Sequence, residues 1–202
     1  MRERKEAFPF FPSFLFVETE FLNLNIRAVY PGTFDPIHFG HMDIIQRSSQ
    51  LFSQVLVAIY DKPLKSLVFS FEDRVALAEK CVTDMGLPNV TVMGYNGLTV
   101  EFCKKVDAQV IVRGLRVFSD FEFEFRMALA NQRMVPEVQT VTLITREQHT
   151  FLSSTTVREI ASLGGNVSTM VPSHVEVALK RRFGELGEDG SAKVVPMTQL
   201  RD

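Results

Sequence analysis

Apolar runs typical of buried strands alternate with helical patterns through most of this 202-residue chain. Five runs have the length and composition of strands: residues 28–30, 55–60, 90–93, 110–112 and 138–144. The segments between them carry apolar residues at helical spacing or helix-capping signals: residues 41–52, 70–86, 99–106 and 119–134. This order favours βαβ units with right-handed crossovers. The sequence therefore predicts an α/β fold, a Rossmann-like doubly wound parallel sheet of five strands with helices on both faces.

Two capping signals and a proline set the expected ends of the helices. Ser70 and Asp73 have the spacing of a capping box, and so do Ser119 and Glu122. Pro136 cannot continue a helix, so we expect the helix that starts near Ser119 to end just before it.

The last third of the chain has a different pattern. Residues 154–163 and 174–183 both have helical spacing, and Gly164 and Gly165 lie between them, which predicts a C-terminal helical segment. The polar, glycine-containing stretch 184–202 is expected to be a flexible tail. We therefore expect one folded domain over residues 27–183.

The first 26 residues superficially resemble a secretory signal, because charged residues precede an apolar stretch. Pro9 and Pro12 interrupt that stretch, Glu18 follows it, and no small-residue cleavage site is present. It is also too short to span a bilayer. We expect residues 1–26 to be a poorly ordered extension, and we expect no membrane-spanning segment elsewhere.

The amino-acid composition indicates a globular domain and argues against nucleic acid as a partner. An apolar content of 46% can bury one sizeable core, and a net charge of −2 gives no global basic field of the kind that attracts nucleic acid. Cys81 and Cys103 lie far apart without disulfide or zinc spacing, which favours free thiols in a reducing cytoplasm.

The stretch 29–41 reads V-Y-P-G-T-F-D-P-I-H-F-G-H and joins the first strand to the first helix. Such a turn presents unpaired main-chain N–H groups and the positive end of the helix dipole to an anion. Gly32 and Gly40 let a ligand approach the backbone, and His38 and His41 can share one face of the first helical turn. The pattern favours a phosphate site, although a histidine at a helix start is in many proteins only a cap.

Basic residues follow two other strands of the expected sheet. Lys62 and Lys65 lie in the loop after residue 60, and Arg113 and Arg116 flank Gly114 after residue 112. Arginine offers phosphate a fixed bidentate fork, whereas lysine acts as a mobile point charge. Since ligands of doubly wound folds bind at the carboxyl ends of strands, these loops are expected to converge on the opening turn. A solvated surface remains the alternative for Lys62.

A third cluster, F-L-S-S-T-T-V-R, covers residues 151–158 and places hydroxyl groups at a helix start. These hydroxyls can cap the helix or bind phosphate oxygens, and Arg158 can point to solvent or to the same anion.

Together these motifs resemble a known superfamily. G-T-F-D-P-x-H-x-G-H is similar to the signature of the nucleotidylyltransferases, whose H-x-G-H segment holds nucleoside triphosphate. Y-P-G-T-F-D-P, R-G-L-R-x-x-x-D-F-E-x-E over residues 113–124, S-S-T-x-V-R and N-Q-R-M-V-P-E over residues 131–137 resemble, more narrowly, the bacterial phosphopantetheine adenylyltransferases. The family commonly has Thr-Asn where this chain has His38 and Phe39, and residues 1–26 have no counterpart in it.

The resemblance implies transfer of the adenylyl group of ATP to 4'-phosphopantetheine in coenzyme A biosynthesis. It implies catalytic roles for His41, Lys65 and Arg116. It places the acceptor on Thr33, Lys65, Thr99 and Arg113. It places ATP on Thr33, Phe34, His41, Gly114, Leu115, Arg116, Glu124, His149, Thr150, Phe151, Leu152, Ser153, Ser154 and Thr155.

The same resemblance implies Mg²⁺ carried on the ATP phosphates, a homohexamer and regulation by coenzyme A. Two rival functions remain open. Nicotinate-mononucleotide adenylyltransferases share the first and last motifs but lack the R-G-L-R segment, and a nucleotide-binding module could keep the fold without turnover.

Overall fold

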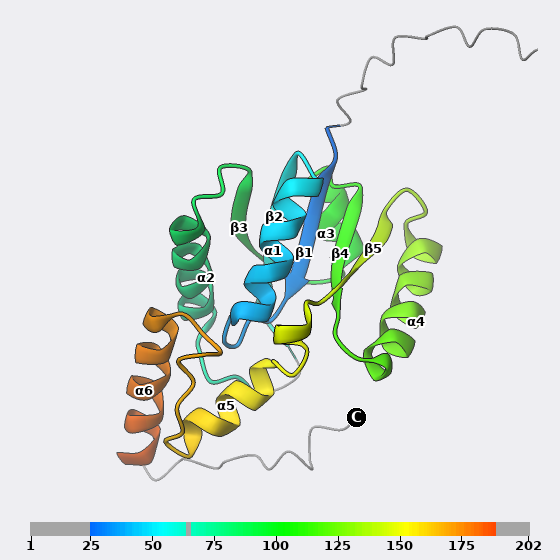
Figure 1. The fold of residues 1–202 in the computed structure, drawn as a ribbon. Coiled ribbons are helices and arrows are strands. Elements are labelled where there is room, and N and C mark those ends of the chain that lie inside the picture. The colour runs from blue at the N-terminus through cyan, green and yellow to red at the C-terminus, as the bar shows by residue number, and fades with distance from the viewer. Residues whose placement is uncertain (1–24, 64–65, 189–202) are drawn as a thin grey trace, which may run out of the picture.

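Five parallel strands form the central sheet of the computed structural model, which describes residues 25–63 and 66–188. The strands are β1 (Arg27–Gly32), β2 (Gln54–Tyr60), β3 (Val90–Tyr95), β4 (Val110–Leu115) and β5 (Gln139–Ile144). Their order in the sheet is β3-β2-β1-β4-β5, and every neighbouring pair is parallel. The chain thus winds from β1 to one edge and then returns to build the other half from β4 (Figure 1).

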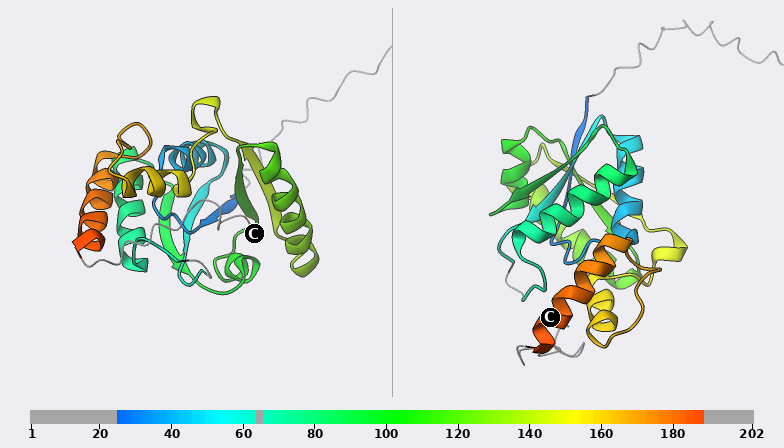
Figure 2. Two further views of the ribbon diagram at one scale, coloured as in Figure 1. Left: turned by 90° about the horizontal axis from the view of Figure 1, so that it is seen from below. Right: turned by 90° about the vertical axis from the view of Figure 1, so that its left-hand side faces the viewer.

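Helices cover both faces of this sheet, as the sequence predicted (Figures 1 and 2). The helices are α1 (Phe39–Leu51), α2 (Phe71–Met85), α3 (Thr99–Lys105), α4 (Phe118–Met134), α5 (Ser154–Ser162) and α6 (Ser173–Glu188), with a short 3₁₀ helix at Glu147–His149. Helices α1, α2, α5 and α6 pack on one face, and α3 packs on the other. No helix of the described part is both long and apolar enough to cross a membrane.

Strand β2 shows why the sheet must be covered on both sides. Val55, Val57 and Ile59 face the core beneath α1 and α2, while Leu56 and Ala58 face the core beneath α3. All five are buried, so the strand is a continuous apolar run rather than an alternating one. That composition suits the centre of a parallel sheet and excludes an exposed edge.

A crevice opens between β1 and β4 at their carboxyl ends. These two strands pair only at Ala28 with Val110 and Val29 with Ile111, whereas β1 stays paired with β2 as far as Gly32. The strand order reverses at this point, and doubly wound folds bind ligands at such a switch point.

Several element ends differ from the expected ones. β1 continues through Gly32 because it stays paired with β2, and β4 continues through Leu115 because its last three residues pair with β5. Arg113 and Gly114 therefore belong to a strand rather than to a loop. Helix α6 extends to Glu188, five residues beyond the predicted end at 183, so 184–188 is helical rather than tail.

The two capping predictions had different outcomes. Ser70 caps α2 by accepting a hydrogen bond from the Asp73 N–H at 3.1 Å, which confirms the first. The Ser119 box is wrong: α4 begins one residue earlier, at Phe118, after Val117, whose side chain makes no capping hydrogen bond. The predicted extension, except for residues 25 and 26, and the tail beyond 188 lie outside the described residues.

Candidate active site

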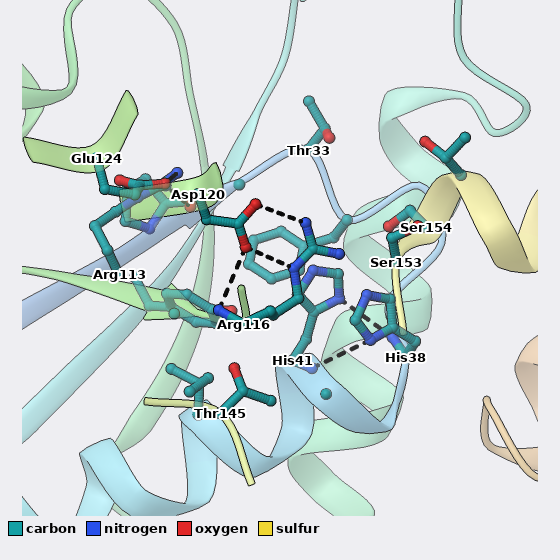
Figure 3. Close-up of a pocket in the computed structure, with 18 of the residues that line it drawn as sticks. Thr33, His38, His41, Arg113, Arg116, Asp120, Glu124, Thr145, Ser153 and Ser154 are labelled. Atoms are coloured by element: carbon teal, nitrogen blue, oxygen red, sulfur yellow. Dashed lines mark hydrogen bonds and ion pairs between the residues drawn. The ribbon is translucent and has the colours of Figure 1, made fainter. Parts of the chain in front are cut away.

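A cavity of about 400 Å³ lies over the carboxyl ends of β1 and β4 (Figure 3). It is lined by residues from four places in the sequence: 30–34 and 38–44 around the opening turn, 113–124 on β4 and α4, and Thr145 with 153–155 before α5. The predicted convergence is therefore confirmed for the opening turn, the R-G-L-R segment and the hydroxyl-rich segment. It is not found for Lys62, which is exposed and does not line the cavity. The volume falls within the range of small-molecule sites.

The turn after β1 is held in an unusual backbone shape. Phe34 has φ of 49°, a conformation that bulky residues rarely adopt, and its ring packs edge-on against His41 with centroids 4.9 Å apart. A Cβ on Gly32 would lie 2.9 Å from the Phe34 ring, so only glycine fits beside it. The turn is thus shaped to place the Phe34 ring against His41.

Two buried groups fasten this turn from behind. Arg74 of α2 is 1% exposed and donates hydrogen bonds to the carbonyl oxygens of Thr33 and Tyr60, both at 2.8 Å. The fully buried Asp35 carboxylate accepts the main-chain N–H groups of Val68 and Phe69 at 3.0 and 2.9 Å. No role was predicted for either residue from the sequence, and both act on the position of the turn.

His38 and His41 form a reciprocal cap at the start of α1. The His41 N–H donates to His38 Nδ1 and the His38 N–H donates to His41 Nδ1, each at 3.3 Å, while the two rings stack with centroids 3.7 Å apart. An imidazole nitrogen that accepts a hydrogen bond carries no proton, so this geometry assigns the proton of each neutral ring to Nε2. His41 therefore meets the cavity as a hydrogen-bond donor.

The His38 ring is held neutral by its surroundings. Burial, followed by the charges of Arg116 and His149, lowers the pKa of His38 to about 3. Two imidazolium rings would repel each other at this separation, and a neutral His38 avoids that repulsion.

Arg113 and Glu124 make a two-point ion pair at the centre of the site. Arg113 Nε donates to Glu124 Oε2 at 2.7 Å and Nη2 donates to Oε1 at 2.6 Å, and Nη1 donates to the Pro31 carbonyl at 3.0 Å. Burial alone would lower the pKa of Arg113, but the hydrogen bonds and charge of Glu124 outweigh it and raise that pKa. One edge of the guanidinium fork is thus occupied, and a phosphate would meet the remaining N–H groups.

Arg116 makes a second ion pair from the end of β4 to α4. Its Nε donates to Asp120 Oδ2 at 3.1 Å (Figure 3). Its Nη1 donates to the Leu152 carbonyl at 2.9 Å. Helix α4 has no buried residue, and Asp120 and Glu124 lie one turn apart on it. The two arginines therefore hold α4 over the cavity by charge.

A narrower cavity of about 180 Å³ adjoins the first one beneath α4. Both cavities are lined by Pro31, Arg113, Phe123 and Glu124, so they meet at the Arg113–Glu124 pair. Thr99 lies in the narrow one, where its hydroxyl is 3.0 Å from the Tyr95 hydroxyl. The site is thus forked, with a wide branch over α1 and a narrow branch beside α3 and α4.

The S-S-T-x-V-R segment mainly makes hydrogen bonds that hold the turn after β1 in position. Ser153 caps α5 by accepting the Thr156 N–H at 3.0 Å, and Ser154 donates to the Pro36 carbonyl at 2.9 Å. Arg158 donates to the carbonyl and carboxylate oxygens of Asp35, and its side chain is 13% exposed. Arg158 is therefore neither on a solvated face nor aimed at the cavity.

Most of the sequence-predicted site residues line the wide cavity: Thr33, Phe34, His41, Arg113, Gly114, Arg116, Glu124, Ser153, Ser154 and Thr155. Six others do not line it: Thr99, which lines the narrow cavity instead, and Leu115, His149, Thr150, Phe151 and Leu152. Leu152 is buried and acts through its carbonyl, and Phe151 is exposed. Lys65 lies outside the described residues.

The sequence missed Tyr30, Asp120, Phe123 and Thr145, which also line the cavity. Burial raises the pKa of Tyr30 well above its usual value, so this phenol stays neutral beside the arginines. The available signal for Asp120 was its place in the R-G-L-R-x-x-x-D-F-E-x-E motif, four residues after Arg116.

Carboxylates in the cavity are engaged with arginines rather than grouped for a metal. Asp120 and Glu124 each pair with one guanidinium, and residues 25–63 and 66–188 contain no group of three metal-ligating side chains. The site favours anionic ligands, because the His41 Nε2–H, the N-terminus of α1 and the remaining guanidinium N–H groups of the two arginines can donate hydrogen bonds into the space.

A doubly wound sheet with a glycine-containing turn, a helix N-terminus and two arginines at its switch point is the form that nucleotide-binding α/β proteins take. The cytidylyltransferase-like family matches residues 29–160. Proteins named phosphopantetheine adenylyltransferase are 48% identical in Methylococcus capsulatus, over 81% of this chain and all of the relative, and 50% identical in Roseiflexus sp., over 78% and 97%. The chain belongs to the phosphopantetheine adenylyltransferases of the cytidylyltransferase-like family.

Solved structures with the same fold are more distant in sequence. The nicotinic acid mononucleotide adenylyltransferase of Plasmodium falciparum has a TM-score of 0.61 at 13% identity, covering 79% of this chain and 96% of its own. A bifunctional NMN adenylyltransferase/ADP ribose pyrophosphatase of Francisella tularensis has a TM-score of 0.60 at 17% identity, covering 83% and 53%. At these identities the likeness concerns the fold alone.

Proposed function

We propose that this protein transfers the adenylyl group of ATP to 4'-phosphopantetheine, giving dephospho-coenzyme A and pyrophosphate. The observation that carries the proposal is the forked site, whose two branches meet at Arg113 and Glu124. The wide branch suits a nucleoside triphosphate over the start of α1, and the narrow branch suits a slender acceptor. Relatives at 48% and 50% identity bear the name of this activity.

The chemistry asks for positioning and charge stabilisation rather than for a base. The attacking phosphate is already anionic, so no side chain has to remove a proton from it. As charge builds on the α-phosphoryl oxygens, the His41 Nε2–H and the N-terminus of α1 stabilise it. Ser153 and Ser154 are engaged in main-chain hydrogen bonds, in agreement with a mechanism without a covalent intermediate.

The remaining residues are assigned to the acceptor or to ATP according to the branch of the site that they line. Thr99 and Arg113 lie in the narrow branch and are assigned to the acceptor, with Thr33 between the substrates. Arg116 lies in the wide branch and is assigned to the ATP phosphates. Lys65 is assigned as a mobile charge that follows the phosphates.

Mg²⁺ is expected to enter as part of the MgATP substrate. Magnesium in phosphoryl-transfer sites is held largely by substrate phosphates and water. The carboxylates of the cavity are neutralised by Arg113 and Arg116, which leaves the triphosphate as the main ligand of the ion.

The test is a pyrophosphate-release assay with ATP and a set of acceptors. Release with 4'-phosphopantetheine and no comparable rate with nicotinate mononucleotide is the expected result. Faster turnover with nicotinate mononucleotide would transfer the chain to that rival activity. ATP binding without pyrophosphate release from any acceptor would make the protein a nucleotide-binding module.

The same proposal extends to assembly, because α4 presents a large apolar face to solvent. Phe118 is 89% exposed, Phe121 stacks between Phe118 and Phe125, and Met134 is also exposed. Monomeric proteins rarely leave so many aromatic side chains uncovered, so we assign this face to contacts between copies in a homohexamer. Light scattering of the purified protein tests it, and Phe118→Asp is expected to reduce the assembly.

Coenzyme A is proposed as a feedback inhibitor, since it contains the same phosphopantetheine arm as the acceptor and would enter the narrow branch. Competition between coenzyme A and the acceptor in the same assay tests this. The free, buried thiols of Cys81 and Cys103 support a reducing cytoplasm as the place of the reaction.

A further inference from the structure

One side chain in the narrow cavity carries an unexplained polar atom. Thr140 of β5 lines that cavity, and its hydroxyl oxygen is buried without a hydrogen-bond partner among the described residues. Buried polar groups are nearly always paired, because burying an unpaired hydroxyl costs free energy. Valine would fill the same volume without that cost, so the hydroxyl needs an explanation outside the protein itself.

The position of Thr140 in the sheet points to a ligand as that explanation. Thr140 pairs with Ile111 of β4, and Thr142 pairs with Arg113. Residues opposite each other in a sheet face the same side, and so do residues two apart along a strand. Thr140 therefore lies on the same face of the sheet as Arg113, two residues or about 7 Å further into the narrow branch.

We propose that the Thr140 hydroxyl is a specificity-determining group that hydrogen-bonds the arm of the acceptor. The inference rests on the proposed function and deepens it. An acceptor whose phosphate lies at Arg113 would place the first polar groups of its chain beside Thr140. A hydroxyl both donates and accepts, so it suits a hydroxyl or amide of an open-chain phosphate ester and gives no advantage to a purely apolar arm.

The test compares three variants in the pyrophosphate-release assay with 4'-phosphopantetheine. Thr140→Val removes only the hydroxyl and should lower kcat/KM for the acceptor about 3- to 10-fold, mainly through KM, while KM for ATP stays unchanged. Thr140→Ser keeps the hydroxyl and should retain most of the acceptor affinity. Thr142→Val alters an exposed threonine on the same face of the same strand and should behave as the unaltered protein.

Melting temperature separates this role from a structural one. Thr140→Val should melt at the same temperature or higher, because it removes an unpaired buried hydroxyl, whereas a structural hydroxyl would lower it. If Thr140→Val leaves the acceptor kinetics unchanged, or lowers kcat/KM equally for ATP and the acceptor, the role of Thr140 is wrong but the proposed function stands. Failure of the unaltered protein to use this acceptor would instead overturn the proposed function, and the assignment with it.

Discussion

Arg113 of β4 and Glu124 of α4 face each other and are joined by two hydrogen bonds of 2.6 and 2.7 Å. Because α4 buries none of its residues, this pair and the Arg116–Asp120 pair replace the apolar packing that usually seats a helix on a sheet. The same pair marks the meeting point of the two cavities. The residues that seat α4 are therefore also the residues that the substrates would contact.

Arg113→Lys should keep the charge but lose the two-point pair and the bond to the Pro31 carbonyl. We expect kcat/KM for the acceptor to fall roughly 10- to 100-fold, with a smaller change in KM for ATP. Steady-state kinetics with each substrate varied in turn measure this. Arg126→Lys, at an exposed ion pair on α4, is the control. If the variant weakens the binding of ATP and of the acceptor equally, the assignment of Arg113 to the acceptor is wrong.

His41→Ala removes a donor that acts on charge in the transition state. We expect kcat to fall roughly 10²- to 10³-fold with little change in ATP affinity. Single-turnover rates and an ATP titration measure the two quantities separately. A variant that keeps more than about a tenth of the original kcat would reduce His41 to a capping residue, since oxyanion-hole deletions cost far more.

The sequence predicted the fold and the convergence of the site because both depend on local patterns. Apolar runs identified all five strands, and the Ser70 cap was visible as spacing. The ends of β1 and β4 were not predictable, because Gly32 and Gly114 become strand residues only through pairing with β2 and β5.

Roles that depend on long-range contacts were also beyond the sequence. The sequence pattern predicted that Arg158 contacts solvent or phosphate. In the structure it donates a hydrogen bond to Asp35, which lies 123 residues away in the chain. Arg74 looks like an ordinary helix residue until β1 and β2 bring their carbonyl groups to it. His38 and His41 do share the first turn of α1, as their spacing predicted, but the two hydrogen bonds that join them could be found only in the folded turn.

His38 should make the fold sensitive to acid. Its pKa in the folded state is about 3, well below the unfolded value of about 6.5, so the unfolded chain binds more protons between these pH values. Stability should therefore fall as pH drops below about 6.5, by up to about 1.4 kcal/mol per pH unit from this group. Urea unfolding at pH 7, 6 and 5 measures it.

His38→Ser supplies the control for that experiment, because serine can cap α1 without titrating. Its stability should decline less steeply with acid than that of the unaltered protein. Parallel declines would mean that His38 is not the group responsible.

Removal of residues 1–24 should leave folding and turnover unchanged. The first described contacts are made by Ile26, whose carbonyl accepts the Ser53 N–H at 3.1 Å and the Ser53 hydroxyl at 2.8 Å. A variant that begins at Ala28 loses these contacts and should melt at a lower temperature. If removal of residues 1–24 by itself abolishes activity, the extension belongs to an interface or to the site.

Arg158→Ala should destabilise the turn that carries Thr33 and Phe34. The variant removes the cation that pairs directly with the fully buried Asp35 carboxylate, although Val68 and Phe69 still donate to it and the charge of Arg74 remains nearby. Removing one partner of a buried pair typically costs about 3 kcal/mol or more, which urea unfolding would detect. Arg181→Ala, at an exposed pair on α6, should cost about 1 kcal/mol or less. If Arg158→Ala keeps its stability but loses ATP affinity, Arg158 contacts phosphate after all.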